Sequence, residues 1–411
     1  MDDAQFAELA GWIANVGLAG ENEPEMVSGF CERAVAFGLP LTRGAVLIDT
    51  LHPLHEGHFF GWQVDGEATL REYGSTREGE AQERWLRSPF YRLVETGAPL
   101  LRRRVNAESR AEFPSIADLA PDATEFVAMI HRFKAQGIIG EMDCVYSSWA
   151  TDQAEGFGDA AIADLERLVP LLALAVKSAA LTRIARTLAE TYLGRDAGRR
   201  VLAGGIMRGV ADWIESVLWF SDLSGYTRIT DTSPPEQVIP LLNDYADAII
   251  SAIHAHGGDV LKLIGDGTLA IFTAESREQA CSAALAAAAQ ARRNLAELNR
   301  RRSAEGLPVT DMYLALHFGA VFYGNIGSKE RLDFTVIGPA VNEVSRIAAL
   351  CRSLDQPVLL SATFAGAAGK AKERLVSVGR YALRGVSHPR ELFTLDPTWD
   401  DRAGERAEKA T

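Results

Sequence analysis

A continuous run of helical apolar spacing near the middle of the chain constrains its fold more than any other feature. Residues 156–194, GFGDAAIADLERLVPLLALAVKSAALTRIARTLAETYLG, keep apolar positions at the intervals of one long α-helix. Residues 181–209 continue this spacing with glycine interruptions, which predicts a helical linker. A chain of 411 residues exceeds the roughly 150 residues of a typical domain. We therefore expect two folded units joined by this helix.

The composition is that of an ordinary globular protein. Hydrophobic residues make up 47% and charged residues 24% of the sequence, which excludes a disordered, fibrous or collagen-like chain. The formal net charge of −13 offers no general attraction to nucleic acid or to an anionic membrane surface. The most apolar stretch, 168–176, falls far short of the roughly 20 residues that span a bilayer. No nucleic acid and no membrane are therefore expected as partners.

The chain ends and the cysteines predict a cytoplasmic protein. The start, MDDAQFAELAG, is acidic and leads into no apolar segment of the kind found in secretory signals. The four cysteines are scattered without CxxC spacing, which favours reduced thiols over disulfides or a zinc site. Residues 397–411 lack apolar residues to bury, and they are predicted to form a disordered tail.

The order of elements over the first 180 residues is similar to that of a GAF-type sensor module. Apolar spacing in FAELAGWIANV and EPEMVSGFCERAVAFGL predicts two amphipathic helices, and strands are expected at 44–50 and 58–65. A helix is predicted over 122–137, and two strands are predicted between it and the long helix. This resemblance implies a sensor or regulatory domain at 1–180, with an unidentified small molecule or protein as its input.

Two aspartates in the second half of the chain lie at the ends of strand-like runs. Asp222 follows the apolar run SVLWF, where the strand gives way to a glycine-containing turn. Asp266 lies between DVLKLI and TLAIF, at the tip of a predicted hairpin. The two carboxylates can therefore approach each other and hold a pair of divalent cations for in-line phosphoryl chemistry. Either aspartate taken alone is better explained as a turn cap.

Three sequence blocks, FSDLSGYT, KLIGDG and FTVIGPAVNEVSR, occur in this order in the second half. Together they resemble the catalytic domain of class III adenylyl and guanylyl cyclases, and the resemblance covers residues 206–396. It implies an α+β protein with two αβ domains. These are the GAF-like domain at 1–180 and a ferredoxin-like class III nucleotide cyclase domain at 210–396, joined by the helical linker at 181–209.

The resemblance also implies a role for individual residues. Asp222 and Asp266 match the family's metal-binding aspartates, the carbonyl of Leu223 follows the first of them, and the family holds two Mg²⁺ or Mn²⁺ ions per active site. Asn342 matches the asparagine that orients the ribose. Arg346, four residues further on the same helix face, matches the arginine that binds charge developing on the phosphates.

Two further residues concern the choice of base. Lys262 matches the base-reading residue, and its ammonium group, which only donates hydrogen bonds, suits N1 of adenine, whereas N1 of guanine carries a hydrogen. Thr335, seven residues before Asn342, matches the second base-reading position of the family. A threonine at this position resembles the bicarbonate-responsive subgroup. Asp333, two residues away, leaves the register of this match open. The resemblance thus implies ATP as the substrate.

Active sites of this family form between two catalytic domains, and this chain carries one complete set of site residues. A head-to-tail homodimer is therefore implied. The family's triphosphate-contacting lysine has no obvious match in YALRGVSHPRELFTL, where Arg384, His388 and Arg390 are candidates to replace it.

The predicted function is that of an adenylate cyclase, a phosphorus–oxygen lyase that converts ATP into 3′,5′-cyclic AMP and pyrophosphate under control of the N-terminal domain. Two alternatives remain. One is the same chemistry on GTP or a pyrimidine nucleotide, and the other is a sensor or interaction protein with a vestigial cyclase domain. The intact set of Asp222, Asp266, Asn342 and Arg346 argues against the second alternative.

Overall fold

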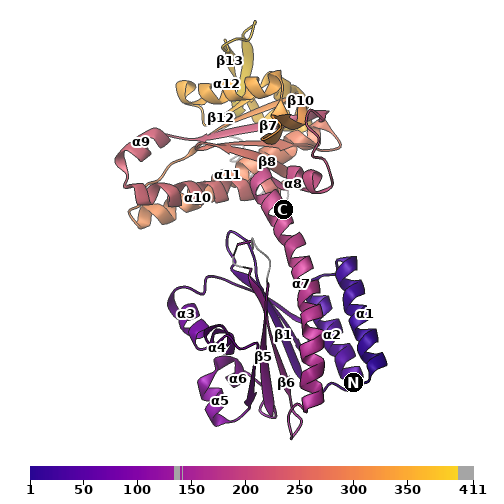
Figure 1. Cartoon of the computed structure of the whole chain (residues 1–411). Coiled ribbons are helices and arrows are strands. Elements are labelled where there is room, and N and C mark those ends of the chain that lie inside the picture. The colour runs from indigo at the N-terminus through magenta and orange to yellow at the C-terminus, as the bar shows by residue number, and fades with distance from the viewer. Residues whose placement is uncertain (134–138, 141, 397–411) are drawn as a thin grey trace, which may run out of the picture. The chain divides into compact units, whose positions relative to one another are not determined.

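The computed structural model describes residues 1–133, 139–140 and 142–396, so the predicted tail at 397–411 lies outside the described residues. The chain divides into two compact units, Met1–Leu188 and Ala189–Thr411 (Figure 1). The division falls inside helix α7, Asp159–Leu193. The segment predicted as a linker, 181–209, comprises the end of α7, helix α8 (Arg195–Leu202) and the turn that follows.

The N-terminal unit is built on a six-stranded antiparallel sheet with the strand order β3-β2-β1-β6-β5-β4. The first two strands in the chain, β1 and β2, match the strands predicted at 44–50 and 58–65. The strands are β1 (Arg43–Asp49), β2 (Gly57–Gln63), β3 (Thr69–Tyr73), β4 (Leu100–Arg104), β5 (Glu125–Arg132) and β6 (Cys144–Thr151).

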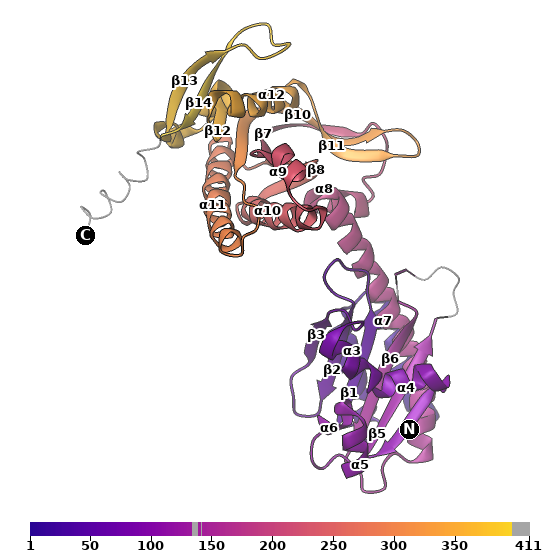
Figure 2. The same ribbon diagram turned by 90° about the vertical axis from the view of Figure 1, so that its left-hand side faces the viewer.

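Helices cover the two faces of this sheet differently (Figures 1 and 2). The predicted helices α1 (Asp3–Ala19) and α2 (Glu23–Ala36) pack with α7 on one face, in a core that contains Phe30 and Trp149. The opposite face carries four short helices and a second apolar cluster. These helices are α3 (Gly79–Leu86), α4 (Pro89–Thr96), α5 (Ala107–Glu112) and α6 (Pro114–Ala117).

The helix predicted over 122–137 is wrong, because Glu125–Arg132 forms strand β5, which pairs with β6 and β4; residues 134–137 of this prediction lie outside the described residues. Val127 of β5 packs into the core beside α7, whereas its neighbours Phe126 and Ala128 pack into the cluster on the opposite face. A strand buried on both faces has no alternation of apolar and polar residues, so its pattern resembles that of a short helix. Of the two strands predicted after it, only β6 is present among the described residues.

Helix α7 lies within the predicted helix at 156–194, and its apolar character extends beyond the stretch 168–176. By length and composition alone it is able to cross a membrane. One side of the helix is nevertheless buried in the core of the N-terminal unit, where Leu165, Leu168, Leu172 and Val176 contribute. A core helix of a folded domain passes the same test of length and composition, so this feature does not by itself indicate a membrane span.

The second unit is built around a mixed sheet with the order β13-β14-β12-β10-β7-β9-β8, in which β11 also pairs with β10. Its long central strands are antiparallel, and only β10 and β12 run parallel. The strands are β7 (Ala211–Leu223), β8 (Gly258–Ile264), β9 (Gly267–Phe272), β10 (Met312–Gly327), β11 (Leu332–Ile337), β12 (Val358–Ser361), β13 (Leu375–Tyr381) and β14 (Arg390–Leu395).

The sheet of this unit lies between two helical layers (Figure 2). Val217 and Trp219 of β7 pack toward α10 and α11, while Leu218 between them packs toward α12. Because β7 is buried on both faces, its end is held firmly in the middle of the sheet. The remaining elements are α9 (Tyr226–Thr232), α10 (Pro235–Ala255), α11 (Arg277–Ala304), α12 (Pro339–Leu354), α13 (Ala362–Ala367) and the 3₁₀ turn Gly369–Arg374.

Candidate active site

The two predicted metal-binding aspartates meet at the end of strand β7. Asp222 is the penultimate residue of β7, and Asp266 lies in the turn between β8 and β9. The backbone amide of Leu223 donates to Oδ1 of Asp222 at 3.1 Å and to Oδ2 of Asp266 at 3.3 Å. The pairing of Ser221 with the start of β9 brings the turn to this position. Gly265 makes the tight turn possible, because its φ of 64° is a left-handed conformation that glycine adopts without strain.

The two carboxylates raise each other's electrostatic energy. Burial, followed by the proximity of Asp266, raises the pKa of Asp222 to about 6, whereas the Leu223 amide and Arg352 act in the opposite direction. Such a half-buried pair of carboxylates is stabilised by any cation placed between them.

The donor set at this position fits a hard divalent cation. Asp222 and Asp266 supply carboxylate oxygens, and the carbonyl of Leu223 lies on the same short segment. Within 1–133, 139–140 and 142–396 no group of three or more His, Cys, Asp or Glu side chains is placed to hold a metal ion. Mg²⁺ commonly keeps few protein ligands and fills its remaining positions with water and substrate phosphates, so two carboxylates are sufficient.

Lys262 lies on β8 and contacts the carboxylate of Asp333 on β11. Thr335 is two residues further along β11, so its side chain lies on the same face of the strand as that of Asp333. Thr335 is buried, whereas Asp333 is exposed. Both candidate partners of Lys262 therefore lie on one face of β11, and Asp333 is the one that contacts the lysine.

Asn342 and Arg346 lie one turn apart on α12. The helix begins at Pro339, directly after Gly338, and its buried face includes Val344 and Ile347, as the apolar stripe predicted. Arg346 is half-buried and lies beside Gly385 of the β13–β14 connection, since a β-carbon added there would lie 3.5 Å from Nη2 of Arg346.

The candidate residues near the C-terminus differ in their surroundings. Arg390 pairs with Glu343 of α12 at 3.5 Å. Arg384 and His388 are exposed in the connection that also contains Gly385. The connection thus approaches Arg346 at Gly385, the residue after Arg384, while Arg390 contacts α12 through Glu343.

The predicted site residues lie in separate groups within one chain. In the described part of the chain, no hydrogen bond or ion pair joins the Asp222–Asp266 pair to Lys262, Asn342 or Arg346. Asp333 was expected only as an alternative in register to Thr335. Arg352, whose charge lowers the pKa of Asp222, was not among the predicted site residues. The helical position of Arg352, ten residues after Asn342, carries no motif that identifies it.

Comparisons with known proteins agree on the second unit. Residues 214–396 match the sequence model of the adenylate and guanylate cyclase catalytic domain. The chain is 28% identical over 212 residues to Adenylate cyclase 1 of Rhizobium meliloti. This match covers 47% of this chain and 31% of that protein. It is also 33% identical over 157 residues to an adenylate cyclase of Anabaena cylindrica. This match covers 37% of this chain and 30% of that protein.

Among solved structures, the adenylyl cyclase CyaB from P. aeruginosa is similar with a TM-score of 0.42 and 22% identity, over 45% of this chain and 95% of that chain. The matched region spans about a third of the length of the two curated relatives, 31% and 30%.

The strained carboxylate pair predicts a specific effect on stability. The folded protein holds the pKa of Asp222 near 6, above its ordinary value of 3.8, so the folded state binds a proton more tightly than the unfolded chain does. This contribution favours folding below pH 4 and is lost as the pH rises through 6. Without divalent ions, Asp222→Asn should therefore melt at a higher temperature than the wild type at pH 8, and the difference should shrink as the pH falls toward 4.

Thermal melts in EDTA across this pH range measure the effect. Asp231→Asn, which changes an exposed carboxylate on α9, is the matched control and should melt as the wild type does. An Asp222→Asn variant that is equally stable or less stable than the wild type at pH 8 would contradict the apposed-carboxylate description.

Proposed function

The second unit belongs to the class III adenylyl and guanylyl cyclase family, whose members are phosphorus–oxygen lyases, and we propose that this chain converts ATP into 3′,5′-cyclic AMP and pyrophosphate. The observation that carries the proposal is the meeting of Asp222 and Asp266 at the amide of Leu223. A turn-capping role for either aspartate does not require the other carboxylate at its side. Turnover of ATP, GTP, CTP and UTP by the purified chain with Mn²⁺, with identification of both products, tests the proposal.

In this proposal the site residues divide the work of cyclisation. Asp222, Asp266 and the Leu223 carbonyl would hold two Mg²⁺ or Mn²⁺ ions, which would supply Lewis-acid polarisation for the phosphoryl chemistry. Arg346 stabilises negative charge that develops on the phosphates, because its guanidinium stays protonated and donates in a planar fork. Asn342, one turn before it, orients the ribose so that the 3′-oxygen faces the α-phosphorus.

The base proposed for the substrate is adenine. The Lys262 ammonium group only donates hydrogen bonds, and it therefore suits N1 of adenine, which accepts one. Asp333 holds this ammonium group in place, and Thr335 or Asp333 accepts from the adenine amino group. The same pocket would leave N1–H of guanine without an acceptor from Lys262, which favours ATP over GTP.

The proposed active unit is a homodimer with two equivalent sites. Asp222 and Asp266 form one group in the chain, and Lys262 with its β11 neighbours and the α12 residues forms others. A second copy placed head to tail would complete each site with the groups that the first copy holds elsewhere. A single chain is then expected to be inactive.

The N-terminal unit is proposed as a GAF-like sensor domain that regulates the cyclase in response to a small molecule or a protein. Its support is the antiparallel sheet with helices α1, α2 and α7 on one face and a cavity on the other. The proposed location is the cytoplasm, since all four cysteines are free and buried. With a net charge of −13, neither nucleic acid nor a membrane is proposed as a partner.

Loss of either aspartate should remove nearly all activity. Asp222→Ala and Asp266→Ala each empty one side of the cation site, and lost transition-state stabilisation of several kcal/mol corresponds to roughly 100-fold or more in rate. Initial rates of cyclic AMP formation measure the loss, and gel filtration checks that the dimer persists. Activity above about a tenth of the wild-type rate in both variants would end the two-metal assignment.

Mixing two inactive variants should restore activity. A heterodimer of an Asp222→Ala chain and an Arg346→Ala chain has one site with both changes and one site with neither, so about half of the activity per heterodimer returns. Native mass spectrometry shows whether the chains exchange. Exchange without restored cyclic AMP formation would rule out sites shared between two chains.

Exchange of the base-reading residue should weaken the preference for ATP. Lys262→Glu supplies an acceptor for guanine N1–H, and one buried base contact is worth about 1 to 3 kcal/mol, or about 5- to 150-fold in preference. The measurement is kcat/KM for ATP divided by that for GTP, with saturating Mn²⁺. Lys329→Glu, at an exposed lysine between β10 and β11, is the control for added charge. An unchanged ratio in Lys262→Glu would remove the support for adenine.

A further inference from the structure

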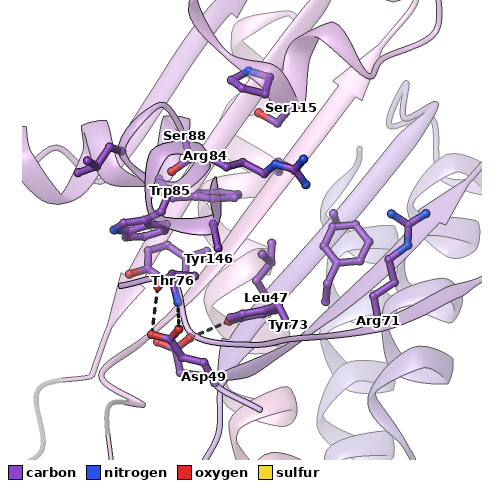
Figure 3. A pocket seen from close by; sticks show the side chains of 18 of the residues that line it. Leu47, Asp49, Arg71, Tyr73, Thr76, Arg84, Trp85, Ser88, Ser115 and Tyr146 are labelled. Carbon is purple, nitrogen blue, oxygen red and sulfur yellow. Dashed lines mark hydrogen bonds between the residues drawn. The ribbon is translucent and has the colours of Figure 1, made fainter. Parts of the chain in front are cut away.

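The N-terminal unit contains a large cavity on the sheet face opposite to α1, α2 and α7. Its volume is about 1380 Å³, and β1, β3, β6 and α3 contribute to its lining (Figure 3). Small side chains on the strands leave this space open, namely Ala45 of β1 with Ser148 and Ala150 of β6. Cavities of roughly 300 to 1,000 Å³ hold drug-sized ligands, so this cavity has room for an organic molecule.

Aromatic rings form one wall of the cavity. Trp85 of α3 lies edge-on to Tyr146 of β6, with ring centroids 5.6 Å apart, and Phe90 lies 5.2 Å from the same tyrosine. Tyr146 and Phe90 are buried, and all three rings line the cavity. Rings held by such mutual packing present a rigid apolar surface on which a planar group can stack.

Arginine side chains line another part of the cavity. Arg71 of β3 and Arg84 of α3 both face it, and among the described residues neither side chain forms an ion pair or hydrogen bond (Figure 3). Arg43 of β1 donates to the carbonyl of Asp118 at 3.0 Å. Burial lowers the pKa of Arg43, Asp118 opposes this change, and the charge of Arg71 lowers the pKa further. Arg43 and Arg71 thus lie close enough to repel one another, and an anion bound beside them would relieve this repulsion.

The other end of the cavity has the opposite charge. Tyr73 donates to Asp49 at 2.6 Å, and Thr76 donates from its hydroxyl to Glu56 at 3.1 Å. Burial raises the pKa of Asp49 to about 6; the Tyr73 hydrogen bond opposes this shift, and Glu56 and Asp143 add to it. A second anionic group on a ligand would be repelled here, so the electrostatics favour a ligand with an anionic group at one end only.

We propose that this cavity binds a planar aromatic molecule with a single anionic group, its ring against Trp85 and Tyr146 and its anion between Arg71 and Arg84. The cavity lies wholly within Met1–Leu188, so binding to it can be measured separately from nucleotide turnover. A carboxylate and a phosphate share the chemistry that two guanidinium groups recognise. The measurement below separates these two sources.

Isothermal titration of the full-length chain with three probes of similar shape tests the proposal. The probes are 2-naphthoate, 2-naphthyl phosphate and neutral 2-naphthamide. At least one of the anionic probes should bind once per chain and at least about 10-fold more tightly than the amide, because charge-assisted hydrogen bonds to arginine are absent for the amide. The anion that binds more tightly identifies the carboxylate or the phosphate as the preferred group.

Variants locate the binding site. The double variant Arg71→Gln, Arg84→Gln changes exposed side chains and should reduce the preference for the anion to less than about twofold. Arg92→Gln, on the exposed side of α4 where it pairs with Glu95, is the matched control and should bind as the wild type does. Ser148→Phe should fill the floor of the cavity and weaken all three probes.

Three results would overturn the proposal. These are the absence of binding by both anions, equal affinity for the anions and the amide, and an undiminished preference in the Arg71→Gln, Arg84→Gln variant. Because these titrations measure affinity and no turnover, they can succeed in a chain that fails to cyclise ATP, and they can fail in one that does cyclise it.

Discussion

The approach of two carboxylates at the amide of Leu223 is the constraint on which the second unit depends. Asp222 and Asp266 come from segments more than forty residues apart, and the antiparallel pairing of β7 with β9 places them at one donor. Two like charges at this distance oppose folding. The sheet withstands them because β7 is buried on both faces, with Trp219 packed in one core and Leu218 in the other.

Several features of the fold could be predicted from local sequence. The helices α1, α2 and α7, the strand ends that carry Asp222 and Asp266, and the apolar stripe of α12 all follow from short-range periodicity and turn composition. Strand β5 could not be predicted, because Val127 and Phe126 are buried on opposite faces, and such a run has no period that distinguishes strand from helix. The helix prediction over 122–137 failed because burial on both faces of the sheet, and not the local pattern, determines the residues of β5.

The candidate site was predictable to a similar extent. The family resemblance predicted Lys262 and Thr335 as base-reading residues, but the contact between Lys262 and Asp333 depends on how β11 folds back along β10. The cavity of the N-terminal unit had no signal in the sequence at all. Arg71, Arg84 and Trp85 line it because β3 and α3 pack over the small residues of β1 and β6, and no spacing rule connects these segments.

The proposed cyclisation requires a pair of cations at Asp222 and Asp266, and counting the bound ions is the sharpest test of this requirement. Electron paramagnetic resonance of Mn²⁺, titrated into the wild-type chain with 3′-deoxy-ATP, should show two ions per bound nucleotide, because this analogue has no 3′-hydroxyl and is not cyclised. The Asp222→Asn, Asp266→Asn double variant should bind no more than the one ion carried by the triphosphate. Two ions per nucleotide in the double variant would contradict the account.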